Sequence, residues 1–215
     1  IAEVYRKIRN TFRFLLGNLY DFDPASDRLN WEELNAIDRY ALIKLQRLID
    51  RVTKAYERYE FHLVYHSIHT FCAVFLSQFY LDVLKDRLYT QPAVSKLRRS
   101  SQTALYEILL ALVKMVSPII PHTADEVWRH ISGVDEISVQ LTDFPTVRSE
   151  WMDASLEEKW DRFLDLRDVV LKALEEARRE KMIGNSLGAM LTLHPSPEVR
   201  ELLEGMEEEL EQLFI

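Results

Sequence analysis

The sequence predicts an all-α protein: a helical bundle followed by a long helix and a small α/β piece. Three observations predict this fold class. Apolar residues recur at steps of three and four over long stretches, as they do on one face of an α-helix. The 215 residues include only five glycines, whereas leucine and glutamate, which favour helices, are abundant. A hydrophobic content of 47% with 29% charged residues is ordinary for a folded chain.

Two domains are expected. Residues 1–148 should form the bundle, because helical stretches follow one another as far as the irregular, proline-containing segment 132–148. Residues 149–215 should form the second domain, with a long helix from about Ser155 to Met182, a short strand within 186–195 and a helical end. A further short extended piece is expected at 137–141. Since no turn or cap precedes Ile215, we expect the second domain to be cut short there.

The first helix, expected from Val4 to Phe22, has two contrasting sides. Its apolar residues fall on one side at about 100° per residue and are Val4, Ile8, Phe12, Leu15 and Leu19. The other side carries Arg6, Arg9, Asn10 and Arg13, and is continued by Gly17 and Tyr20. Guanidinium groups bind anionic oxygens bidentately, and glycine lets a backbone approach closely. This side therefore suits a phosphate backbone, the alternative being an ordinary solvated face.

Charge and the single cysteine exclude several classes of protein. The net charge of −8 argues against binding nucleic acid by global attraction, so any RNA contact must use a local basic face. The lone Cys72 excludes a disulfide framework or a cysteine-based metal site in this chain, and its apolar surroundings predict a buried, inert thiol. No apolar run of about 18 residues and no signal peptide is found, so we expect a cytoplasmic chain with no membrane partner.

Candidate catalytic and metal-binding groups are weak. His62, His66 and His69 share one helix face, but that face continues into apolar core residues, so structural histidines are expected and no metal site. The sequence has no glycine-flanked nucleophile and no phosphate-binding glycine loop. We therefore expect no catalytic residues, which favours a binding module. Among the tryptophans, Trp128 and Trp160 lie in apolar periodic stretches and are expected in the core. Base stacking and packing both remain open for Trp31 and Trp151.

Four blocks of sequence resemble the bacterial-type isoleucyl-tRNA synthetases of class I. They read KIRNTFRFLLGNLYDFDP, FYLDVLKDRLY, SPIIPHTADEVW and ARREKMIGNSLGA. The third is shared widely among class I synthetases, whereas the first and last indicate isoleucine. Gly188 departs from the family, which often has glutamate in this block. The alternatives are the equivalent domain of a valyl-, leucyl- or methionyl-tRNA synthetase, a helical protein–protein scaffold, and a metal-dependent bundle oxidase.

The resemblance implies the anticodon-binding region of such an enzyme without its catalytic core. It implies that the chain binds and positions tRNA(Ile) through the anticodon stem-loop. The catalytic and editing domains would belong to the same polypeptide, a monomer that uses ATP and Mg²⁺. Many family members also hold zinc in a C-terminal module, which this chain lacks. The residues expected to bind tRNA are Arg6, Arg9, Asn10 and Arg13, with Arg98 and Arg99 as secondary candidates.

Overall fold

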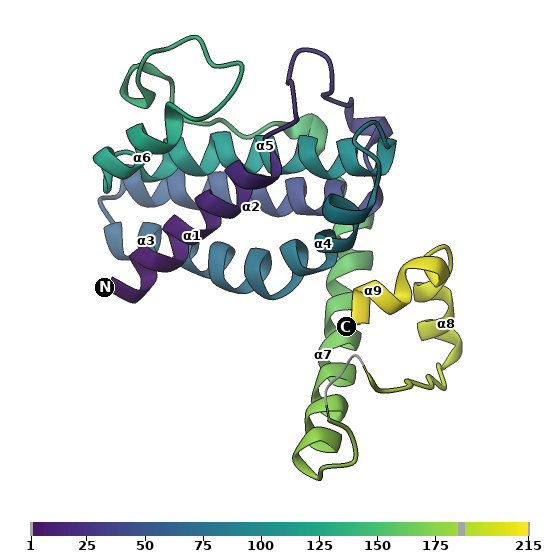
Figure 1. Ribbon diagram of the computed structural model, residues 1–215. Helices are drawn as coiled ribbons and strands as arrows, with labels where there is room; N and C mark the ends of the chain where they lie inside the picture. The colour runs from purple at the N-terminus through teal and green to yellow at the C-terminus, as the bar shows by residue number, and fades with distance from the viewer. Residues whose placement is uncertain (1, 185–187, 215) are drawn as a thin grey trace. The chain divides into compact units, whose positions relative to one another are not determined.

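The computed structural model describes residues 2–184 and 188–214, and the chain divides into two compact units, residues 1–152 and 153–215 (Figure 1). The first unit ends four residues after residue 148, where the sequence predicts the domain boundary. The predicted division into two domains stays a prediction. The described ranges contain helices but no strand, which confirms the predicted helical fold class. The prediction of a short strand within 186–195 is wrong for residues 188–195, which form no regular strand. Residues 186 and 187 lie outside the described residues. The extended piece expected at 137–141 is also wrong, because a 3₁₀ turn, η3, occupies Val139–Leu141.

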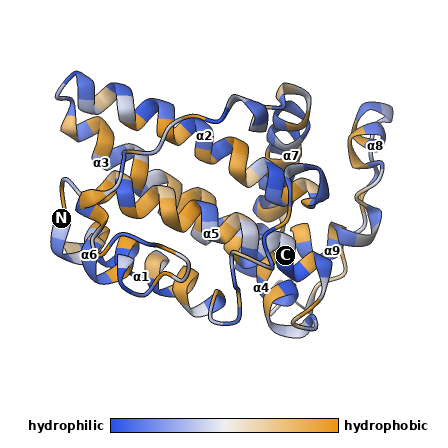
Figure 2. Cartoon of the chain, turned by 90° about the horizontal axis from the view of Figure 1, so that it is seen from above, coloured by the Kyte–Doolittle hydropathy of each residue, from blue (hydrophilic) through white to orange (hydrophobic). Residues whose placement is uncertain are grey.

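The first unit is a bundle of α-helices joined by short 3₁₀ turns. Its main helices are α1 (Ala2–Asn18), α2 (Ala36–Glu57), α3 (Phe61–Thr70), α4 (Leu81–Thr90), α5 (Lys96–Val116) and α6 (Pro121–Trp128). The turns η1 (Trp31–Glu33) and η4 (Ser149–Trp151) precede α2 and end the unit. In Figure 2, α5 lies between α2 and α1 and is largely hydrophobic along its length.

One continuous helix runs from Phe61 to Thr90 and comprises α3, η2 (Phe71–Tyr80) and α4. Its middle part, η2, is a π-helix. The Ser77 hydroxyl donates to the Cys72 carbonyl at 2.7 Å, five residues back, which matches the wider π turn. By length and composition this helix could cross a membrane, but 61% of its most apolar window is buried within the unit, as in the core helix of a bundle.

In the part of the second unit that the structure describes, a long helix is followed by short ones. The long helix α7 spans Ala154–Arg179, so it ends three residues before the expected Met182, and Asp153 caps it by accepting from the Leu156 amide. It packs with α8 (Pro197–Leu203) and α9 (Leu210–Phe214), and α9 contacts the turn η6 (Glu207–Glu209). Rings of α7 and α9 meet at Phe163 and Phe214, 5.3 Å between centroids.

Candidate nucleic-acid interface

Helix α1 is held to the bundle by a narrow buried stripe. The stripe contains Ile8, Phe12 and Leu15, which lie at steps of four and three and are nearly or fully buried. Two polar residues on the same side satisfy themselves within the helix: the Thr11 hydroxyl donates to the Lys7 carbonyl at 3.0 Å, and the Asn18 amide to the Phe14 carbonyl at 2.9 Å. Across the bundle α1 crosses α5 and the long α3–α4 helix (Figure 1). This packing fixes which side of α1 meets solvent.

The side of α1 that meets solvent is the basic one. We call Arg6, Arg9, Asn10 and Arg13 the arginine face, and all four are exposed. Within residues 2–184 and 188–214, none of the four side chains forms an ion pair or a hydrogen bond with another residue. The acidic residue on α1, Glu3, lies 3.8 Å from Lys7 instead. Three guanidinium groups are therefore available to an anionic ligand.

The arginine face continues with two further exposed residues, Gly17 and Tyr20. Gly17 is exposed, and a Cβ atom added there would meet no atom within 4 Å, so packing inside the protein does not require glycine. Tyr20 follows the end of α1 with 78% of its side chain exposed. Both observations leave room for a ligand on this side.

Arg98 and Arg99, at the start of α5, are placed differently from what the sequence predicts. Arg98 is 7% exposed, and its Nη2 donates to both carboxylate oxygens of Asp21 at 2.9 Å. Arg99 lies 3.1 Å from Asp27 and donates to the Asp21 carbonyl at 2.9 Å. Their charges are engaged inside the protein, where they connect the segment after α1 to α5, and tRNA binding by either residue stays a prediction.

The electrostatics of Asp21 reflect this cluster, which we call the Asp21 cluster (Asp21, Asp27, Arg98, Arg99, Gln102). Desolvation alone would raise the pKa of Asp21. Hydrogen bonds from Gln102 and Arg98, together with the charges of Arg98 and Arg99, outweigh it and hold that pKa below its ordinary value of 3.8. Asp21 thus remains ionised and keeps its hold on the two arginines.

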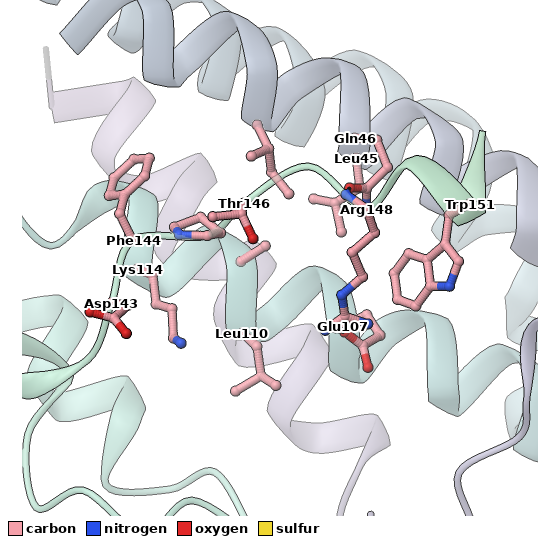
Figure 3. A pocket seen from close by; sticks show the side chains of 13 residues that line it. Leu45, Gln46, Glu107, Leu110, Lys114, Asp143, Phe144, Thr146, Arg148 and Trp151 are labelled. Carbon is pink, nitrogen blue, oxygen red and sulfur yellow. Dashed lines mark hydrogen bonds and ion pairs between the residues drawn. The ribbon is translucent and has the colours of Figure 1, made fainter. Parts of the chain in front are cut away.

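A second site lies beneath the segment that ends the first unit. A cavity of ≈ 320 Å³ separates residues 143–151 from α2 and α5, with Glu107 at its floor (Figure 3). Arg148 extends from the segment toward Glu107, 3.3 Å away, and its amide donates to Gln46 at 2.8 Å. Arg28 also pairs with Glu107. Burial raises the pKa of the Glu107 carboxyl, although both arginines oppose that shift.

The second site, which we call the Glu107 tie, consists of Arg28, Gln46, Glu107 and Arg148, and it holds distant segments of the chain together. Arg28, Glu107 and Arg148 come from three separated parts of the chain, so no local sequence pattern could reveal them. The tie also explains the two undecided tryptophans: Trp31 stacks on Trp151 at 6.1 Å with an angle of 10°, and Arg148 covers Trp151 at 4.2 Å. Both rings have neighbours inside the unit, so we assign them to packing. Trp128 and Trp160 are buried, as predicted.

The remaining candidates do not form a chemical site. In the described part of the chain, no three His, Cys, Asp or Glu side chains gather to hold a metal ion. His66 and His69 instead lie against the ring of Tyr65. Cys72 is buried, and desolvation raises the pKa of its thiol to about 12. This thiol is inert, as its apolar surroundings predict.

Comparisons with known proteins find one family that matches most of the chain and individual relatives that align with all of it. The family described as the anticodon-binding domain of tRNA ligase matches residues 38–193. Isoleucine–tRNA ligases of Bacillus subtilis, Bacillus cytotoxicus and Halalkalibacterium halodurans are 59%, 58% and 55% identical over 215 residues. The alignments cover all of this chain but 23% of each relative, so the chain spans about a quarter of their length. The arginine face lies outside the family match but inside these alignments.

Proposed function

We propose that this chain is the tRNA-binding part of an isoleucine–tRNA ligase. The premise is that the chain belongs to the family of anticodon-binding domains of tRNA ligases. The observation that carries the proposal is the identity of 55–59% over the full chain to proteins of that name. The arginine face supports it, since it offers unpaired guanidinium groups on a protein of net charge −8.

The RNA is bound through its backbone and its unpaired nucleotides. Side chains cannot read the deep major groove of an RNA helix, so sequence-specific RNA recognition uses loops with accessible bases. Arg6, Arg9 and Arg13 contact phosphates of the anticodon stem-loop of tRNA(Ile), and Asn10 can donate to and accept from a base or ribose. The net charge of −8 opposes unspecific attraction of a polynucleotide, so binding depends on this local basic face.

The parent protein attaches isoleucine to this tRNA using ATP and Mg²⁺. Catalytic and editing domains of the same polypeptide perform the chemistry. The proposal assigns no catalytic step to this chain, because it gives the chemistry to those other domains. The role of this chain is to bind and position tRNA in a monomeric, cytoplasmic enzyme.

Binding of labelled tRNA(Ile) transcript to the 215-residue chain tests the proposal. Filter binding is measured at low and moderate salt, and backbone footprinting locates the protected nucleotides. We expect salt-sensitive binding with protection in the anticodon stem-loop. Protection confined to the acceptor stem, or no binding at low salt by chain shown to be helical by circular dichroism, would contradict the proposal.

A further inference from the structure

A second cavity opens where the arginine face ends. It has a volume of ≈ 400 Å³ and lies between the C-terminal end of α1 and the segment that follows α6. This volume falls within the range of about 300–1,000 Å³ typical of ligand pockets. Its floor is apolar and aromatic, with buried side chains that include Phe22, Tyr106 and Ile131. Its exposed rim carries hydrogen-bonding groups, those of Tyr20, His130 and Ser132.

The ring of Tyr20 is exposed and yet held in place. The Arg98 guanidinium lies 5.9 Å from the centroid of this ring. Arg98 is itself buried and fixed by both oxygens of Asp21. A cation near an aromatic ring in this range attracts it, so the Asp21 cluster orients Tyr20 without covering it. A ring positioned in this way is ready to stack on a flat ligand.

The cavity also continues the arginine face. Leu16, which lines it, lies seven residues after Arg9 and three after Arg13, which places the three within about 60° of one another around the helix. A polynucleotide whose phosphates meet Arg9 and Arg13 therefore runs toward the cavity. The unpaired guanidinium groups supply the charge complementarity for such a ligand, whereas the apolar floor would not hold a phosphate.

We propose that this cavity receives one unpaired base of the anticodon loop, stacked on Tyr20, while Arg9 and Arg13 hold the adjoining phosphates. A nucleobase has an apolar face and a polar edge, which fit the aromatic floor and the hydrogen-bonding rim. The inference rests on the proposed function and extends it, because it assigns a base-binding residue that carries no charge.

The test is a double-mutant cycle between Tyr20 and single bases of the RNA. The chain and its Tyr20→Ala variant are titrated with the tRNA(Ile) anticodon stem-loop, either intact or with one loop base removed at a time. Base–aromatic stacking predicts that Tyr20→Ala weakens binding of the intact RNA by about 5-fold or more. One abasic position should weaken binding to the wild-type chain by a similar factor and cause no further loss in Tyr20→Ala.

Three variants make the result specific. Tyr20→Phe keeps the ring and should retain most of the affinity. Tyr89→Ala removes a tyrosine that is 64% exposed and does not line the cavity, and it should bind as the wild type does. Tyr20→Ala should leave the salt dependence of binding unchanged because no phosphate contact is lost, whereas Arg9→Ala should reduce it. Thermal unfolding of Tyr20→Ala near the wild-type temperature shows that the fold persists.

The outcomes separate this inference from the proposed function. If the RNA binds with the expected salt dependence but no abasic position is coupled to Tyr20, the base-binding cavity is overturned and the proposed function stands. An equal loss in Tyr20→Phe and Tyr20→Ala would also overturn stacking. If the wild-type chain does not bind the RNA, the proposed function fails first and the inference fails with it.

Discussion

Two helices of this chain, α1 and α5, carry groups of arginines that lie in opposite environments. The arginine face of α1 carries guanidinium groups that are exposed and without partners in the described residues. Arg98 and Arg99 of α5 are engaged by carboxylates of the segment that follows α1. The difference comes from acidic residues distant in sequence: Asp21 lies 77 residues before Arg98. Positive charge on a helix therefore indicates an RNA contact only where the fold leaves it unpaired.

The largest effect in this comparison is expected from Arg98→Ala on stability. The substitution leaves Asp21 with a partly buried charge and fewer partners, which should reduce the free energy of unfolding by about 3 kcal/mol. Denaturant unfolding measures it. Arg51→Ala is the control, since Arg51 is exposed and should change stability by less than about 0.5 kcal/mol. Equal effects of the two substitutions would refute a structural role for Arg98.

The opposite pattern, a loss of RNA affinity with unchanged stability, is expected from Arg9→Ala combined with Arg13→Ala. The double variant should lose about 100-fold in affinity for tRNA(Ile), because charge-assisted hydrogen bonds contribute about 1.5–3 kcal/mol each and solvent exposure keeps these at the low end. Its stability should stay within about 0.5 kcal/mol of the wild type. Arg51→Ala with Arg58→Ala removes the same charge from two exposed positions, one in α2 and one directly after it, and serves as the matched control. Similar losses in both double variants would indicate that only net charge matters.

A smaller effect is expected from Gly17→Ala, which should raise the stability of the chain and lower its affinity for RNA. Alanine should stabilise the helix by about 0.5–1 kcal/mol, and the added methyl group meets open space within the protein. If an RNA backbone approaches this position closely, the same substitution should weaken RNA binding. Melting temperature and Kd are measured on one preparation. As a contrast, Gly205→Ala should destabilise the chain, because Gly205 has a φ of 79°. An unchanged Kd for Gly17→Ala would exclude close approach.

The smallest effect concerns pH. Since the pKa of Asp21 in the folded protein lies below its ordinary value of 3.8, its ionised form contributes stability that is fully present above about pH 3.8. That contribution is lost as the pH falls through the lower folded pKa. The difference in unfolding free energy between the wild type and Asp21→Asn should therefore shrink below pH 3.8, by less than about 1 kcal/mol. A difference that grows with acidity would contradict the ion-pair assignment.

The sequence predicted what depends on periodicity and on family likeness. The apolar stripe of α1 identified its buried side, and with it the exposed position of Arg6, Arg9, Asn10 and Arg13. The resemblance to isoleucyl-tRNA synthetases is confirmed by the matches over the chain. That these four residues bind tRNA stays a prediction, because exposure alone does not identify a ligand.

What the sequence did not predict depends on contacts between distant segments. The Asp21 cluster and the Glu107 tie each join residues more than 70 positions apart, and no helical period relates them. The π-helical turn at Phe71–Tyr80 has the same apolar composition as an α-helix, so its periodicity could not be distinguished in advance. The strand expected within 186–195 rested on a short apolar run, for which helix, strand and loop are hard to tell apart.

The salt dependence of tRNA binding tests the central claim most directly. The logarithm of the association constant is plotted against the logarithm of salt concentration for the wild type and for Arg9→Ala with Arg13→Ala. If both guanidinium groups contact phosphates, the slope should fall by about 0.7–0.9 for each arginine removed. An unchanged slope would show that the arginine face is only solvated and that the RNA is bound elsewhere.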